Sequence, residues 1–94
     1  MIKNFKHKGL KKLFETGLSP KASPELQTRC LIILDLLDTA DTADTPDAMN
    51  VAGLRFHELK HNRKGCFSVS VTGNYRITFE WDDGATVVDL EDYH

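Results

Sequence analysis

The chain has 94 residues, of which 40% are hydrophobic and 28% are charged. This composition is ordinary for one globular domain, so we expect a single domain over residues 1–94. No apolar run is long enough to cross a membrane and the first residues lack the apolar block of a signal peptide, which excludes a membrane protein and indicates a cytoplasmic one. The two cysteines, Cys30 and Cys66, fit no metal or redox spacing.

The net charge of −2 conceals a sorting of charges along the chain. Lysines dominate residues 1–12 and basic residues return at 54–64, whereas residues 35–47 and 80–94 are acidic. Segregated charges can build a local field that the net sum does not reveal. For the aspartates of 35–47 we favour a simpler interpretation, a solvated face.

The first elements are a short strand and a helix. Residues 1–5 alternate in polarity and predict a short strand. Leu10, Leu13 and Phe14 then recur at helical spacing, and Gly17 is suited to end that helix in a left-handed conformation.

A second helix is predicted to begin with Ser23 as its N-cap and Pro24 in its first turn, and to run to about residue 40. Its apolar residues form a stripe and partly surround the helix, so more than one side must be covered. We favour the sheet and the first helix as the cover, with a partner protein as the alternative. The Asp- and Thr-rich residues 38–49 predict a loop, and they lack the glycine and glutamate of an EF-hand.

From Cys66 onward the hydrophobic period changes to two, which predicts three antiparallel strands. In the central strand Tyr75, Ile77, Phe79 and Trp81 face inward, and "DDG" predicts the hairpin turn that follows. We therefore expect an α+β fold: an N-terminal strand, then two helices packed on one face of an antiparallel sheet whose other face is polar and open.

The last strand must return its end to the neighbourhood of Arg76, because it pairs antiparallel with the strand before it. Val88, Leu90 and Asp92 share one parity, although Val88 and Leu90 look like core residues and Asp92 does not. Either a bulge re-aims the last residues or the strand ends near Leu90. We take Val87, Val88 and Leu90 as its apolar anchors.

The segment "RFHELKHNRK" (residues 55–64) combines histidines with cations next to this polar face. RNA cleavage needs a base for the 2′-OH proton, an acid for the leaving 5′-oxygen, and cations for the phosphate charge. Lone histidines and basic clusters are more often structural or simply solvated, so the pattern alone is weak. A zinc site at His57, His61 and Cys66 is disfavoured because Cys66 lies on a predicted strand, and we expect neither metal nor cofactor.

The segments "MIKNFKHKGLKKLFETG", "HELKHNRKGCFSVSVTGNYRITFEW" and the terminal "EDYH" together resemble the HigB, or plasmid-maintenance killer protein, branch of the RelE/ParE toxin superfamily. The resemblance covers nearly the whole chain and is weakest at "DTADTADTPDAMN". It implies a microbial-RNase-like fold and a ribosome-dependent, metal-independent endoribonuclease that cuts translated mRNA. It also implies a HigA-type helix-turn-helix antitoxin, with operator DNA bound only through that antitoxin.

In such toxins the active residues lie in an H-x-L-K segment, an N-[WY]-R segment and a terminal D-Y-H. Matched to this chain, these are His57, Lys60, Asn74, Arg76, Asp92, Tyr93 and His94. On these residues we expect proton transfer by His57 and His94, with either as the base, and a phosphate held by Arg76 and Lys60. We expect Asp92 to orient a histidine, Tyr93 to contact the substrate and Asn74 to position a neighbouring group. We add Arg63 and Lys64 from the basic segment as RNA-binding residues.

Two other functions stay open. ParE-type relatives share the fold and bind DNA gyrase without cutting RNA, but they are not expected to end in "DYH". A non-catalytic RNA-binding module would need a basic face and surface aromatic residues, whereas the strand aromatics here are predicted to lie in the core.

Overall fold

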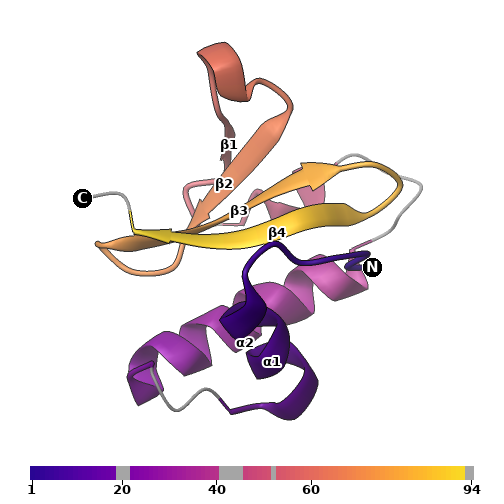
Figure 1. Cartoon of the computed structure of the whole chain (residues 1–94). Coiled ribbons are helices and arrows are strands. Elements are labelled where there is room, and N and C mark those ends of the chain that lie inside the picture. The colour runs from indigo at the N-terminus through magenta and orange to yellow at the C-terminus, as the bar shows by residue number, and fades with distance from the viewer. Residues whose placement is uncertain (19–21, 41–45, 52, 93–94) are drawn as a thin grey trace.

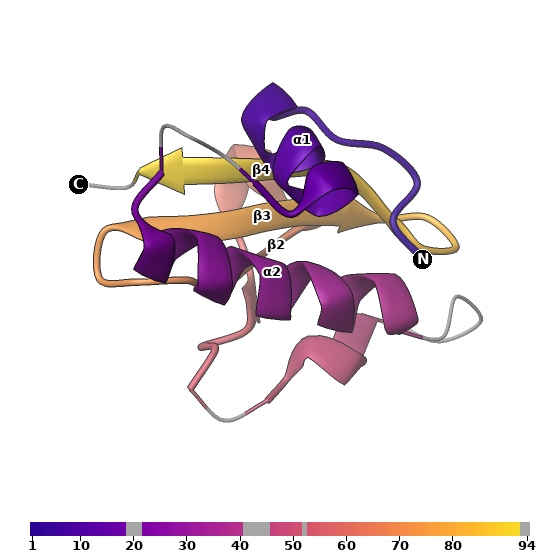
Figure 2. The same ribbon diagram turned by 90° about the horizontal axis from the view of Figure 1, so that it is seen from below.

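The computed structural model describes residues 1–18, 22–40, 46–51 and 53–92. Two helices cover one face of a four-stranded antiparallel sheet with the order β1-β2-β3-β4 (Figures 1 and 2). The α+β class is therefore confirmed. The predicted three-strand meander is extended by a short strand that the sequence pattern did not reveal. The strands are β1 (His57–Glu58), β2 (Cys66–Ser70), β3 (Tyr75–Trp81) and β4 (Ala85–Asp92).

Helix α1 (Lys8–Thr16) ends at the predicted Gly17. The Nδ1 atom of His7 caps its start by accepting a hydrogen bond of 2.9 Å from the Leu10 backbone N–H. Gly17 ends it with φ 78°, where a side chain would be strained, and its N–H donates to the Leu13 carbonyl. Leu10 and Leu13 are buried, so the helix presents its apolar side to the core.

Helix α2 (Pro24–Thr39) starts with the predicted Ser23 cap, whose Oγ accepts from the Leu26 N–H at 3.2 Å. Four residues of its stripe are buried: Cys30, Ile33, Leu34 and Leu37. Ile32 is 57% exposed on the opposite side. The sheet and α1 therefore cover one face of α2, and Ile32 is uncovered within the described residues. None of the described helices is long and apolar enough to span a membrane.

The loop predicted for residues 38–49 contributes to the core. Pro46–Met49 forms a short 3-10 helix, η1, and the Met49 side chain is fully buried. Burying one side chain of this size stabilises the fold by roughly 1.5–3 kcal/mol. The prediction of a plain connector was therefore incomplete, and residues 41–45 lie outside the described part of the chain.

The N-terminal residues run beside β4 without forming the regular strand that was predicted. Two isolated parallel bridges join Ile2 to Ala85 and Phe5 to Val88. Gly84 allows this close approach, because a Cβ atom there would lie 2.8 Å from the Met1 carbonyl oxygen. The start of the chain is thus fastened to the β3–β4 turn.

Strand β4 contains a bulge, but earlier than the chain end where it was expected. The register between β3 and β4 shifts between Thr78 and Glu80, and Val87 has a φ of 50°. Val87 is 38% exposed, so its prediction as an apolar anchor is wrong, whereas Val88 is fully buried. The bulge reverses the parity of β4 after Thr86, so Val88 faces the core and Glu91 lies on the polar face. Neither predicted alternative is found, because the strand continues to Asp92 without a register shift after Val88, and Asp92 keeps the parity of Val88 and Leu90.

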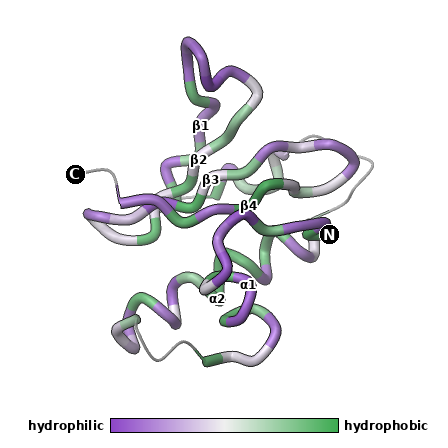
Figure 3. The backbone as a smooth tube through the Cα atoms, viewed as in Figure 1, coloured by the Kyte–Doolittle hydropathy of each residue, from purple (hydrophilic) through white to green (hydrophobic). Residues whose placement is uncertain are grey.

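The polar face of the sheet is less open than predicted. Ser68 and Thr78 are each 2% exposed although they point away from the helices. We call residues 59–65, which link β1 to β2, the arm. The arm projects on the side of the sheet opposite the helices (Figure 1), and its tip is hydrophilic (Figure 3).

Candidate active site

The strand register lines up the candidate residues in rows across the polar face. Residues paired directly across antiparallel strands share a face. His57 pairs with Ser68, Ser68 with Thr78 and Thr78 with Asp89, which makes one row across all four strands. The neighbouring row joins Ser70, Arg76 and Glu91. His57 and Arg76 therefore lie on one face in adjacent rows, with backbones separated by about 12 Å from strand spacing and rise.

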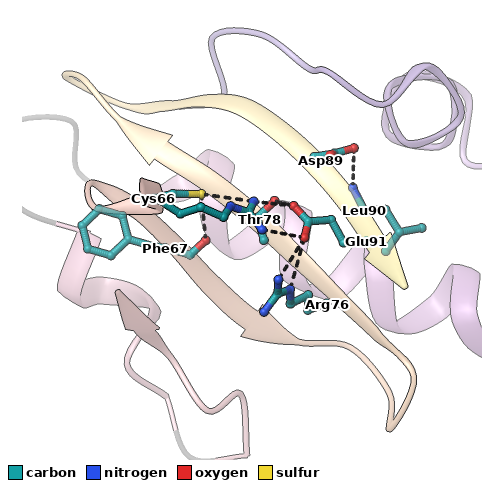
Figure 4. Close-up of polar contacts among 8 residues, drawn as sticks. Cys66, Phe67, Arg76, Thr78, Asp89, Leu90 and Glu91 are labelled. Atoms are coloured by element: carbon teal, nitrogen blue, oxygen red, sulfur yellow. Dashed lines mark hydrogen bonds and ion pairs between the residues drawn. The ribbon is translucent and has the colours of Figure 1, made fainter. Parts of the chain in front are cut away.

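Glu91 is the centre of the polar contacts on this face (Figure 4). Its Oε1 atom accepts hydrogen bonds from Arg63 Nη1 at 2.9 Å and from Arg76 Nη2 at 3.0 Å. Its Oε2 atom accepts from Arg63 Nη2 and from the Thr78 hydroxyl, the latter at 2.9 Å. The Glu91 carboxylate is thus hydrogen-bonded to one side chain of the arm and to two side chains of β3.

The electrostatics of this cluster favour an ionised Glu91. Hydrogen bonds from Arg63 first, and from Thr78 and Arg76 next, lower the pKa of Glu91 from its ordinary value of 4.5 to about 2, although partial burial acts in the opposite direction. The same contact raises the pKa of Arg63. Because two guanidinium groups share one carboxylate, the three side chains carry one net positive charge.

The arm is shaped by local hydrogen bonds that bring Arg63 back over the sheet. The Leu59 N–H donates to the Cys66 carbonyl at 2.7 Å, which closes the base of the arm. At its tip, His61–Arg63 forms a 3-10 helix, η2, and Gly65 turns with φ 90° while its N–H donates to Glu58 Oε2. The arm therefore has a fixed course from β1 to β2.

His57 lies exposed on β1, the edge strand. Its Nδ1 atom is 2.9 Å from the Arg55 carbonyl oxygen. A carbonyl can only accept a hydrogen bond, so this contact favours the tautomer with hydrogen on Nδ1 and leaves Nε2 with a free lone pair. Such a nitrogen can take a proton from a hydroxyl group.

The remaining predicted residues fall into two groups. Asn74, in the β2–β3 turn, and Asp92, which pairs in register with Tyr75, are exposed at the same end of the sheet as Arg76. Lys60 and Lys64 are exposed on the two sides of η2. The predictions for Tyr93 and His94 fall outside the described residues.

Sequence reasoning missed Glu91 and Thr78 as members of the site. Glu91 was noted only as part of the terminal acidic stretch, and Thr78 lies on the face that was predicted to be polar. The turn and the antiparallel pairing gave only the neighbourhood, because the register set at the turn would place Leu90 opposite Arg76, and the bulge shifts the pairing by one residue to Glu91. The contact between Glu91 and Arg63 had no sequence signal, since it depends on the course of the arm.

Residues 57–61 read His-Glu-Leu-Lys-His, the letter pattern of a helical zinc site, which the sequence argument against zinc overlooked. That pattern binds zinc when a helix brings both histidines to one face. Here His57 and Glu58 form β1, and His61 begins η2. Among the described residues no group of three or more His, Cys, Asp or Glu side chains is arranged to hold a metal ion.

A hollow of about 300 Å³ adjoins the cluster on the polar face. Arg63, Thr78 and Glu91 line it, together with Lys6, Lys64 and Asp89. It brings the N-terminal segment and the arm to one concave surface, where Lys6, Arg63 and Lys64 are balanced by the three carboxylates of Glu80, Asp89 and Glu91. Charges that are far apart in the sequence therefore meet in a hollow of mixed sign.

Comparison with known proteins gives the family. Residues 3–94 match the family described as the RelE-like toxin of type II toxin-antitoxin system HigB. This chain belongs to the HigB toxin family. It is also 42% identical over 95 residues to a Proteus vulgaris protein named Endoribonuclease HigB, with both chains covered completely. The resemblance inferred from the sequence is confirmed, and membership of a type II system implies a cognate antitoxin as partner.

Proposed function

We propose that this HigB-family toxin is an endoribonuclease that cleaves mRNA while it is translated on the ribosome. RNA cleavage by the toxin is supported by the family and by the named activity of the Proteus vulgaris relative, which is similar over its whole length. The observation that carries the mechanism is the polar face, on which His57 and Arg76 occupy adjacent rows. Ribosome dependence rests on the family resemblance of the sequence.

The proposed reaction is attack of a ribose 2′-OH on the adjacent phosphorus. The P–O5′ bond breaks, so the products are a 2′,3′-cyclic phosphate and a 5′-OH. One histidine of the pair His57 and His94 takes the 2′-OH proton, and the other gives a proton to the leaving oxygen. Arg76 and Lys60 hold the phosphate and stabilise its added charge, so no metal ion takes part.

The other predicted residues support this pair. Asp92 orients a histidine, Tyr93 contacts the substrate, and Asn74 positions a neighbouring group at the end of β3. Lys64, which is exposed on the arm, attracts the RNA backbone, because an accessible cation raises the local concentration of phosphates. Arg63 has a different position from the one expected of an RNA contact, since its guanidinium is bound to Glu91.

The antitoxin is proposed to be of the HigA type, with a helix-turn-helix that binds operator DNA, so that the toxin reaches DNA only through it. We propose that it holds the helical side of the toxin, where Ile32 is exposed on α2. Such a complex leaves the polar face accessible. Neutralisation then depends on keeping the toxin from the ribosome.

The test is cleavage of a defined mRNA by purified toxin, with 5′ ends mapped on free RNA and on RNA bound to translating ribosomes. We expect cuts only in the ribosome-bound RNA, and their loss in His57→Ala. Equal cleavage of free RNA would contradict ribosome dependence. Retained RNA binding without cuts would indicate a binding module, and inhibition of DNA supercoiling without cuts would indicate a gyrase toxin.

A further inference from the structure

The two arginines of the polar face are not equivalent. Arg63 contacts Glu91 through both terminal nitrogens, one to each carboxylate oxygen, whereas Arg76 contacts only Oε1, through Nη2 at 3.0 Å and Nε at 3.3 Å. A two-point contact between a guanidinium and a carboxylate fixes the relative orientation of both groups. Arg63 therefore fixes the carboxylate, and the carboxylate in turn fixes Arg76.

We propose that Glu91 is a positioning residue for the proposed cleavage reaction, which it serves by holding the Arg76 guanidinium in the orientation that receives the phosphate. The inference rests on the proposed function. Arg63 and Thr78 hold Glu91, so that the carboxylate stays in place. None of these three residues needs to touch the reacting atoms.

The cluster has the features of a preorganised site. The Glu91 and Arg76 side chains are each 22% exposed, and Thr78 beneath them is buried. By contrast, the Arg29–Glu25 pair on α2 is largely solvated, with side chains 54% and 75% exposed. Solvated pairs of this kind are mobile and weak. A partly buried carboxylate with three donors can hold a charged side chain in one orientation before the substrate arrives.

The charges of the cluster also suit a phosphodiester. One net positive charge remains on Arg63, Glu91 and Arg76 together, which matches the single negative charge of the substrate. Without Glu91, two guanidinium groups that now donate to the same oxygen would repel each other and separate. Glu91 itself is a poor proton carrier, since its carboxylate is occupied by donors and its pKa is lowered to about 2. Its effect must therefore pass through Arg76.

The opposite role for Glu91 is competition with the substrate phosphate for Arg76. Glu91 would then be a competitor that neutralises Arg76 and must be displaced by the RNA. In that case removing its charge would strengthen RNA binding and leave cleavage as fast or faster. The two roles differ in the sign of the effect.

The deciding variant is Glu91→Gln, which keeps the size of the side chain and removes its charge. We expect kcat for ribosome-bound mRNA to fall by about 10- to 100-fold, as for a displaced catalytic group, with KM changed by no more than about threefold. The matched control is Asp38→Asn, which loses the same charge from a carboxylate that accepts a structural hydrogen bond from the Ile2 N–H on the helical side. The control should cleave like the wild type.

A double-mutant cycle separates positioning from general damage to the fold. If Glu91 acts through Arg76, then Glu91→Gln should change kcat by no more than about twofold in an Arg76→Ala background. A merely structural role would reduce kcat by the full factor in both backgrounds, and that result would overturn the proposal. Wild-type or higher kcat in Glu91→Gln would overturn it too.

A second variant covers the case in which Glu91→Gln does not fold, as judged by circular dichroism. Arg63→Lys keeps the positive charge and cannot bind both carboxylate oxygens at once. We expect Arg63→Lys to lower kcat by less than Glu91→Gln does. In an Arg76→Ala background, Arg63→Lys should change kcat by no more than about twofold.

If the wild-type toxin itself fails to cut ribosome-bound mRNA, the proposed function is wrong and this inference is wrong with it. If the wild type cuts and Arg63→Lys and Glu91→Gln cut equally well, only the inference is wrong.

Discussion

Removing the charge of Glu91 should destabilise the protein at neutral pH and have little effect in strong acid. Glu91→Gln resembles the protonated form of Glu91, because both are neutral and nearly equal in size. The pKa of Glu91 is about 2 in the folded protein against an ordinary value of 4.5. This difference corresponds to at most about 3 kcal/mol of folding free energy. Because the side chain is 22% exposed, solvent screening reduces the effect and we expect about 1–3 kcal/mol.

The pH dependence follows from the lowered pKa. Above about pH 4.5 the carboxylate is ionised in both the folded and the unfolded chain, and its full contribution is present. As the pH falls from 4.5 towards 2, the unfolded chain binds the proton first, so the contribution is lost. The stability difference between wild type and Glu91→Gln should therefore be constant from pH 7 to pH 5 and shrink below pH 4.5.

Urea unfolding at several pH values measures this difference. Trp81, the single tryptophan, is half-buried and packs edge-on against Phe79 at a ring-centroid distance of 6.4 Å, so its fluorescence should report the loss of the core. A domain of this length has about 5–15 kcal/mol of stability, so Glu91→Gln should remain folded. Asp38→Asn is again the control. A difference that stays the same from pH 7 to pH 3, or a more stable Glu91→Gln, would refute the reasoning.

Three further predictions concern catalysis. His57→Ala and His94→Ala should each slow cleavage of ribosome-bound mRNA by about 10²–10⁴-fold, the usual loss of a general acid or base, while thermal unfolding changes little. Stripping zinc with a selective chelator, with the magnesium of the ribosomes retained, should leave the cleavage rate unchanged. Deleting residues 92–94 should abolish growth arrest and preserve antitoxin binding in a pull-down, because the groups removed act as a unit.

Each of these has a result that would contradict it. Full toxicity of the double variant lacking both histidines would exclude their role as the proton-transfer pair. Activity that is lost with the chelator and restored by zinc would support a metal site at His57, His61 and Cys66. Growth arrest by the chain that ends at Glu91 would show that the terminal residues are an ordinary tail.

The helices and the β3–β4 hairpin could be predicted because their signals are local. Ser23 and Gly17 mark helix ends through the conformations of one or two residues. The "DDG" turn places Trp81 opposite Ala85 and Glu80 opposite Thr86, which is the start of the β3–β4 hairpin. In each case a few neighbouring residues determine the outcome without reference to the rest of the fold.

Strand β1 and the burial of Met49 could not be predicted, because neither has a local signal. Two residues, His57 and Glu58, are too few to show a period of two, and they become a strand only by pairing with β2. Met49 follows a polar stretch of sequence, and its burial depends on where η1 meets the core. The bulge at Val87 was not predicted at its place either, since a bulge was expected only at the end of β4, and the Val87 N–H donates to Asn4 Oδ1 in the distant N-terminal segment.

The cluster around Glu91 shows why the arrangement of a site is harder to predict than its members. Arg76 was recognised from a short motif, but its orientation depends on a residue fifteen positions later and on Arg63 in the arm. The separation of basic and acidic segments along the sequence also shapes this cluster. A basic arm and an acidic strand end attract each other, and their contact leaves one positive charge facing the surface that is proposed to receive RNA. The acidic C-terminal stretch, which alone would repel RNA, thus helps to organise the cations that are proposed to bind it.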